Sequence, residues 1–319
     1  MPITLNQLLE NLPRNWGRWG ADDELGCLNF LGPAEVLRGA AEVREGAVFT
    51  LGAPITDPRG DPAFPGIGRS APARTNSQDF ADYRSGKAQM LPGGLEFADD
   101  QIALGTHAGT HFDGLGHTWI EGQTWNGYSA EVTIGSMQKA SVLPIAEHGI
   151  VGRGVLLDIA RLRGKQRLDR GEPFTHDDLL AAAAAQGVTI EPHDVLLIRT
   201  GAIGLFYEIG QEAYLAAPFV ETGLMFSEAL VRWYHELELP IFATDTIGNE
   251  FTDWENMDYV APLHAALMRN LGVLFSEILW LDDLAAACAA RNRWTFFFAA
   301  TPLKIVGGTA ALVNPIAIL

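Results

Sequence analysis

Short, continuous apolar runs alternate with amphipathic segments through the second half of the chain. Apolar runs bounded by turn residues are typical of strands buried on both faces, whereas apolar positions three and four apart are typical of helices. The pattern predicts buried strands over 154–160, 194–200, 241–245 and 273–279, and helices over 175–186, 224–237, 259–270 and 282–292. Within residues 295–308 it predicts one more strand, followed by Pro and Gly. This order supports an α/β or α+β fold without fixing a topology.

The first hundred residues are less regular. Residues 4–11 and 33–43 are predicted to form helices, the second opening on Pro33, and 47–55 a strand. Residues 56–97 are dense in Pro, Gly, Ser, Asp and Arg and are predicted to form a long loop. Loops of that length in compact domains are commonly binding loops or lids, and an inert excursion is the alternative.

Composition excludes several classes of protein. The chain has 319 residues, of which 48% are hydrophobic, so it can bury a sizeable core as one domain or two. A formal net charge of −17 disfavours nucleic acid and anionic membrane surfaces as partners. No signal-peptide pattern and no apolar run of ~20 residues is visible. With only Cys27 and Cys288, no disulfide framework is expected, and these features together predict a cytoplasmic protein.

Candidate chemistry concentrates in residues 107–117, HAGTHFDGLGH, which hold three of the eight histidines and an aspartate. Imidazole and carboxylate together suit Zn²⁺, Mn²⁺ or Fe²⁺. The glycines and threonines of this stretch disfavour a helix, and a straight strand would separate His107 and His111 by about 13 Å, too far to share an ion bound at ~2 Å. A bend at Gly109 would let His107, His111 and Asp113 converge with open coordination positions, and would leave His117 as a second-site ligand or a general acid/base.

Further candidates come from other parts of the chain. Glu277 lies within an apolar strand, where a carboxylate is costly to bury unless it is paired or binds a metal. Trp119, Trp125 and Tyr128 follow the histidine stretch and could wall a pocket for a planar substrate, with core packing as the alternative. Four histidines outside residues 107–117 are interpreted as structural; these are His148, His176, His193 and His235.

Two strand ends carry polar residues of ambiguous role. Asp158 follows a buried strand and is interpreted as a turn residue rather than a neighbour of the metal ligands. Asp245 and Thr246 end the strand that begins at 241, where a polar pair either faces an active site or caps the following segment.

The histidine stretch resembles the HxGTHxDxPxH signature of the cyclase family of metal-dependent hydrolases, which includes kynurenine formamidase, isatin hydrolase and a dienelactone hydrolase. His107, Gly109, Thr110, His111, Asp113 and His117 fall on the signature, and Leu115 stands where it has Pro. His264 and Glu277 resemble the second His and Glu of the family, which approach the metal from the opposite side. Residues 15–36 resemble the N-terminus of its longer members.

This resemblance implies a single α/β domain over 1–319, with a β-barrel-like core flanked by helices and a loop-rich N-terminal extension over 1–45 packed on it. It also implies a homodimer or larger homo-oligomer. His107, His111, Asp113, His117 and Glu277 are the expected metal ligands, with Zn²⁺ or Mn²⁺ as the ion. Whether one or two ions bind stays open.

The expected activity is hydrolysis of an amide, such as an aryl formamide or a cyclic amide or imide, or of a lactone, by a metal-activated water. His117 or His264 would protonate the leaving group, and Glu277 would hold a second metal or orient one of these histidines. No GxSxG is present, which disfavours a serine triad. A metal-dependent lyase or cyclase acting through an enolate and a non-catalytic metal-binding protein remain the alternatives. The substrate is expected to be decided at Leu115 and in the 56–97 loop.

Overall fold

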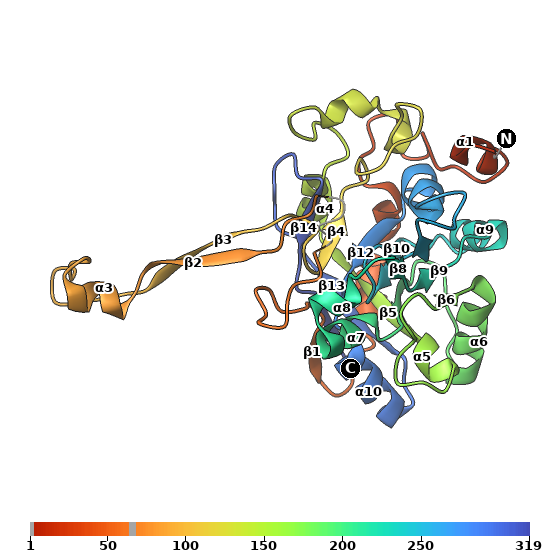
Figure 1. Cartoon of the computed structure of the whole chain (residues 1–319). Helices are drawn as coiled ribbons and strands as arrows, with labels where there is room; N and C mark the ends of the chain where they lie inside the picture. The colour runs from red at the N-terminus through yellow and green to blue at the C-terminus, as the bar shows by residue number, and fades with distance from the viewer. Residues whose placement is uncertain (1–2, 64–67) are drawn as a thin grey trace.

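Four parallel strands form the middle of a nine-stranded sheet (Figure 1). The computed structural model describes residues 3–63 and 68–319. The four strands are β5 (Ile150–Asp158), β7 (Val195–Arg199), β10 (Ile241–Thr244) and β12 (Leu274–Glu277). Every residue of β7, β10 and β12 is buried, which is why these strands read as continuous apolar runs in the sequence. The buried strands predicted in this half of the chain are confirmed.

Antiparallel strands continue the sheet on both sides. The order is β1 (Val48–Thr50), β15 (Ile316–Ile318), β13 (Thr295–Ala300), β5, β7, β10, β12, β4 (His111–Asp113) and β14 (Ala310–Leu312). The sheet curls into a half-barrel flanked by helices, so the α/β fold with a barrel-like core is confirmed. The apolar C-terminal residues dock on the body as β14 and β15.

Helices cover the sheet, with α2 against β5 and β13 and α6 against β5. The α-helices of the body are α1 (Leu5–Leu8), α2 (Pro33–Ala40), α4 (Val142–His148), α5 (Ile159–Leu162), α6 (His176–Gln186), α7 (Ala202–Ile209), α8 (Gln211–Tyr214), α9 (Glu228–Glu236) and α10 (Asp282–Arg291). Shorter elements are the 3₁₀ turns η1 (Gly26–Phe30), η3 (Trp125–Gly127) and η4 (Ala130–Thr133), the π-helix η5 (His264–Leu271), and the small strands β6 (Pro173–Phe174), β8 (Val220–Glu221), β9 (Gly223–Leu224) and β11 (Thr252–Asp253). No helix in the described ranges is long and apolar enough to cross a bilayer.

Several elements are shorter than their sequence patterns predict, because local caps end or start them. α6 begins after Thr175, whose hydroxyl accepts the Asp178 N–H, and ends at Gly187 in a left-handed conformation, as predicted. α9 begins only at Glu228, because Ser227 caps it. The helix predicted from 259 starts at His264 and is a π-helix, a geometry that is frequent at functional sites.

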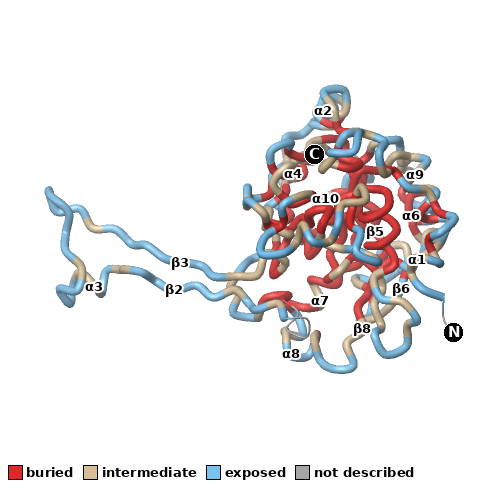
Figure 2. Tube along the Cα trace, turned by 90° about the horizontal axis from the view of Figure 1, so that it is seen from above, coloured by how far each residue is buried: buried red, intermediate tan, exposed pale blue. Residues whose placement is uncertain are grey.

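A long arm projects from the body where the sequence pattern predicts a loop (Figures 1 and 2). β2 (Ala73–Gln78) and β3 (Asp99–Ala103) pair antiparallel, and α3 (Phe80–Ser85) lies near the tip; we call residues 73–103 the arm. Every residue from 68 to 106 is described, and none of them is buried. The loop prediction is wrong here because a ribbon exposed on both faces shows no alternation of apolar residues. Residues 64–67 of the predicted loop lie outside the described residues.

The N-terminal segment lies against the body rather than apart from it. Leu9, Cys27 and Leu28 belong to the main hydrophobic core. The Asn15 side chain donates a hydrogen bond of 2.9 Å to the carbonyl of Leu271, the last residue of the π-helix that begins at His264. This segment therefore supports the element that carries His264.

Candidate metal centre

Two adjacent strands present the central groups of the site. β4 holds His111 and Asp113, and the chain bends over residues 108–110 before it, as predicted. β12 ends at Glu277, which lies directly opposite His111 in the antiparallel pair. The Ser276 hydroxyl donates to the His111 carbonyl at 3.0 Å and ties the two strands together. Because residues opposite each other in a sheet point to the same face, this register brings the Glu277 carboxylate to the histidine stretch.

The imidazoles surround the two carboxylates at short distances. Nε2 of His107 and Nε2 of His111 lie 3.2 and 3.3 Å from Oδ1 of Asp113. Oε2 of Glu277 lies 3.5 Å from His111 Nε2, and Oε1 lies 3.5 Å from Nε2 of His264. Residues far apart in the chain, 107–113 and 264–277, therefore meet in one cluster.

The cluster contains two overlapping sets of groups that could hold a metal ion. One set is His107, Asp113 and His117, the other is Asp113, His264 and Glu277, and within each set the ligand atoms lie within 4.8 Å of one another. His107 Nε2, His111 Nε2, both Asp113 oxygens and Glu277 Oε2 are buried and have no hydrogen-bond partner among the described residues. Buried polar atoms without partners are rare, so this convergence fits an ion as the missing partner. Asp113 is shared by both sets.

Local hydrogen bonds orient the imidazoles toward Asp113. His111 Nδ1 lies 2.7 Å from the Gly109 carbonyl, so it carries the proton and Nε2 keeps its lone pair. His107 Nδ1 lies 3.2 Å from the Thr106 hydroxyl, which leaves Nε2 facing the carboxylate. Such second partners fix the tautomer of metal-binding histidines.

His264 is held by a buried carboxylate that the sequence did not reveal. Glu250, which is 2% exposed, accepts hydrogen bonds from the backbone N–H groups of Leu263 and His264 at 2.7 and 2.9 Å and from His264 Nδ1 at 2.5 Å. These bonds fix the first turn of η5 and leave His264 Nε2 facing the cluster. Glu250 lies in a turn after β10, where neither an apolar run nor a motif marks it.

Electrostatics give these groups distinct protonation states. Burial lowers the pKa of His107, and lowers that of His117 to about 3. Burial alone would raise the pKa of Asp113, but the imidazoles around it hold that pKa well below its usual range. Burial also opposes a charge on His264, but the hydrogen bond to Glu250 and the other carboxylate beside it raise its pKa to about 10. Burial likewise opposes a charge on His111, but Asp113 and Glu277 beside it raise its pKa. An anionic Asp113 has the protonation that metal binding requires, and a metal at His111 would compete with a proton for Nε2.

A cavity of about 210 Å³ opens onto the cluster. His117, His264 and Glu277 form its inner end, and Glu250 also lines it. The remaining wall is largely apolar, with one cation; it consists of Arg69, Thr118, Phe219, Ile247, Gly248, Thr252, Trp254, Val260 and Ala261. The chain thus offers a space in which a small molecule can reach the candidate metal centre.

The aromatic residues predicted to wall the pocket lie elsewhere. Trp125 is fully buried in the core, and its Nε1 and the Tyr128 hydroxyl both donate to the Asp23 carbonyl, at 3.1 and 3.2 Å. Trp119 is 51% exposed, and none of the three lines the cavity. Leu115 is fully buried and also lies outside the cavity wall. These residues are close to the histidine stretch in sequence, but the fold does not bring their side chains to the cavity wall.

Other predicted residues have structural roles. Asp158 accepts the Arg161 N–H and caps α5, as predicted for a turn residue. Asp245 accepts the N–H groups of Thr200 and Gly201 at 2.8 and 2.6 Å, so it holds the segment that leads into α7. The other four histidines, His148, His176, His193 and His235, lie outside both candidate metal sets.

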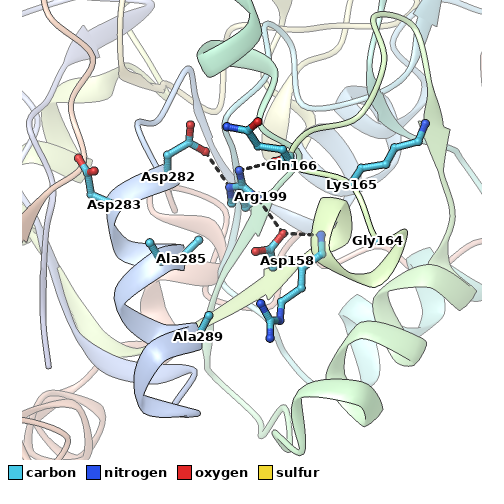
Figure 3. A pocket seen from close by; sticks show the side chains of 11 residues that line it. Asp158, Gly164, Lys165, Gln166, Arg199, Asp282, Asp283, Ala285 and Ala289 are labelled. Atoms are coloured by element: carbon cyan, nitrogen blue, oxygen red, sulfur yellow. Dashed lines mark hydrogen bonds and ion pairs between the residues drawn. The ribbon is translucent and has the colours of Figure 1, made fainter.

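A larger cavity, of about 730 Å³, lies at the carboxyl ends of β5 and β7 (Figure 3). Arg199 stands at its centre, with Nη1 3.0 Å from Asp158, Nε 2.7 Å from Asp282 and Nη2 2.7 Å from the Gln166 carbonyl. Its charge is therefore satisfied by the protein, and the groove presents no buried polar atom that a ligand would need to pair.

Comparisons with known proteins agree with this geometry. A family model described as putative cyclase matches residues 32–250. The crystal structure of a novel cyclase is 34% identical, with a TM-score of 0.86, and the match covers 96% of this chain and 100% of that chain. No curated protein gives a significant match.

Two more distant structures share the fold. An isatin hydrolase bound to the product analogue thioisatinate is 20% identical, with a TM-score of 0.60 and coverage of 90% of this chain and 95% of that chain. Isatin hydrolase A from Labrenzia aggregata, bound to benzyl benzoate, is 21% identical, with a TM-score of 0.59 and coverage of 87% and 94%. Because the family model spans well over half of the chain and the 34% identical structure matches nearly all of it, this protein belongs to the cyclase family.

Proposed function

We propose that the protein is a metal-dependent hydrolase that opens an amide or a lactone with a metal-activated water. The observation that carries this proposal is the convergence of five buried metal-ligand atoms, which have no hydrogen-bond partner among the described residues, beside a cavity lined by His117, His264 and Glu277. The similarity to structures described as isatin hydrolases supports hydrolysis as the reaction class. Aryl formamides, cyclic amides or imides, and lactones are the substrate classes to test.

The chain supplies distinct groups for binding and for proton transfer. His107, His111 and Asp113 would hold one divalent ion, with His117 and Glu277 completing the site or holding a second. A bound ion supplies Lewis acidity and lowers the pKa of a coordinated water toward neutrality. Nitrogen and oxygen ligands of this kind suit Zn²⁺ and Mn²⁺.

His264 is the group best placed to move the proton. Its Nδ1 is held by Glu250 at 2.5 Å, so Nε2 is the atom that faces the cavity and the Glu277 carboxylate. From there, Nε2 would give its proton to the departing nitrogen or oxygen. The apolar part of the cavity would exclude water from the substrate while the bond breaks.

Acid release from a formanilide, a cyclic imide and an unsaturated lactone tests the proposal, with chelated protein assayed before and after addition of Zn²⁺ or Mn²⁺. We expect hydrolysis of at least one compound to depend on added metal. His111→Ala should bind no metal and release no acid while keeping the circular dichroism of a folded chain. Metal binding by the wild type without release of acid from any compound would refute hydrolysis and favour a lyase or a binding protein.

A further inference from the structure

Among the described residues that line the cavity leading to the metal centre, one is an arginine. Arg69 is half-buried and lines this cavity together with His117 and Trp254. Its guanidinium makes no hydrogen bond or ion pair with any described residue. Nearby arginines differ in this respect, since Arg59 pairs with Asp57 at 2.8 Å and Arg74 with Asp100 at 2.7 Å.

Neither of the two carboxylates among the described residues of the cavity wall is available to neutralise Arg69. Glu250 is occupied by two backbone N–H groups and His264. Glu277 is directed at His111 and His264 in the candidate metal centre. In a chain with a net charge of −17, an arginine left without a carboxylate partner in a cavity is a local exception to the general charge.

Arg69 lines the same cavity as His117 and Glu277 of the candidate metal centre. A molecule that occupies this cavity can therefore contact both the guanidinium and the metal-ligand residues.

Apolar residues line the same cavity as the cation and the metal-ligand residues. Phe219, Ile247, Trp254 and Val260 line the wall, so the cavity combines a metal-binding end, an apolar wall and one guanidinium. A planar guanidinium binds carboxylates through two parallel hydrogen bonds and remains charged at any physiological pH. A neutral molecule would leave this capacity unused.

We propose that Arg69 selects substrates that carry a carboxylate in addition to the scissile carbonyl. The inference rests on the proposed function, because it adds Arg69 to the candidate metal centre as a second group that binds the substrate in the same cavity. The scissile group lies at the metal centre, an apolar and preferably aromatic body contacts the wall, and the carboxylate pairs with Arg69.

Paired substrates test this assignment. We would compare para- and meta-formamidobenzoate with the neutral formamidobenzamides of the same shape, using wild type, Arg69→Gln and Arg69→Lys. In Arg69→Gln, kcat/KM for the carboxylates should fall about 10- to 100-fold, as expected for a lost hydrogen bond to a charged group, mainly through KM. The carboxamides should change by less than about 2-fold, and Arg69→Lys should lie between because it keeps the charge without the fork.

Equilibrium binding provides a readout that does not depend on turnover. Calorimetry with Zn²⁺-loaded protein would compare succinate, terephthalate and biphenyl dicarboxylate with their monomethyl esters. The wild type should bind at least one diacid about 10-fold more tightly than its monoester, and Arg69→Gln should lose that preference. Arg59→Gln removes a paired cation from outside the cavity and should retain it.

The outcomes separate the two proposals. Equal loss for charged and neutral substrates in Arg69→Gln, or a wild type that binds diacids and monoesters equally, would overturn the role of Arg69. Failure of every formamide to be hydrolysed, together with an Arg69-dependent preference for diacids, would instead count against the formamide chemistry and leave the anion site in place.

Discussion

Asp113→Asn is the sharpest single test of the metal centre, because Asp113 is the one residue shared by both candidate sets. Its side chain is 1% exposed, and both of its oxygens lack hydrogen-bond partners. The substitution keeps the shape of the side chain and removes the negative charge that a divalent ion would neutralise. It therefore separates loss of metal from loss of packing.

The expected magnitude follows from binding linkage. An ion present at about 1,000 times its dissociation constant adds about 4 kcal/mol to the free energy of unfolding. At about 2.1 cal/mol/K of unfolding entropy per residue, each kcal/mol raises the Tm of a 319-residue chain by about 1.5 °C, so metal should raise the Tm of the wild type by about 6 °C. Asp113→Asn should lose most of this rise, while its metal-free Tm should differ from that of the wild type by less.

Differential scanning calorimetry in chelator and in excess Zn²⁺ or Mn²⁺ measures both quantities, and atomic absorption gives the metal content. Asp100→Asn is the matched control, because Asp100 lies on the exposed arm and pairs only with a surface arginine. Asp100→Asn should keep the full metal-induced rise in Tm. A full rise in Asp113→Asn, or a wild type that binds metal without any rise in Tm, would refute the assignment of Asp113.

Three further outcomes follow from the structure. Glu250 and Glu277 raise the pKa of His264 to about 10 despite burial, whereas the pKa in an unfolded chain is about 6.5. The ion pair therefore stabilises the metal-free protein fully below pH ~6.5, and this stabilisation is lost as pH rises toward 10. Tm measured against pH in chelator should fall over this range, and Glu250→Gln should make the fall smaller. Trp125→Ala should cost about 3–5 kcal/mol in urea unfolding, because Trp125 is a fully buried core residue, and an unchanged stability would contradict that placement. Replacing the arm, 73–103, with a short Gly-Ser linker should leave the urea midpoint nearly unchanged, since it buries no residue; a large loss would mean that the arm supports the body.

The parts of the molecule that could be predicted from the sequence are those with a local signal. The spacing of His107, His111 and Asp113, with glycine between them, required a bend, and the bend is present. Glu277 was recognisable because a carboxylate within an apolar strand needs a partner. The parallel strands were recognisable because burial on both faces leaves continuous apolar runs.

The residues that could not be predicted acquire their roles only from tertiary structure. Glu250 and Arg69 lie in irregular segments without a motif, and the fold brings them to the cavity from opposite halves of the chain. Trp125 follows the histidine stretch closely in sequence, but the chain turns it into the core. The arm escaped prediction because its side chains face solvent on both sides, so no hydrophobic period marks its strands.

The way the arm joins the body has a consequence for how this protein can diverge. Its only covalent links are the two chain segments at its base, and lengthening an exposed loop costs little, about 0.6 kcal/mol for each doubling. Insertions, deletions and grafted sequences in 73–103 should therefore be tolerated by the sheet. Both ends of the arm lie near the site in sequence, because Arg69 lies four residues before the first arm strand and His107 four residues after the second. The tip of the arm could drift in sequence and length while the chemistry stayed constant, whereas changes at its base would reach specificity through Arg69 and the metal centre through His107.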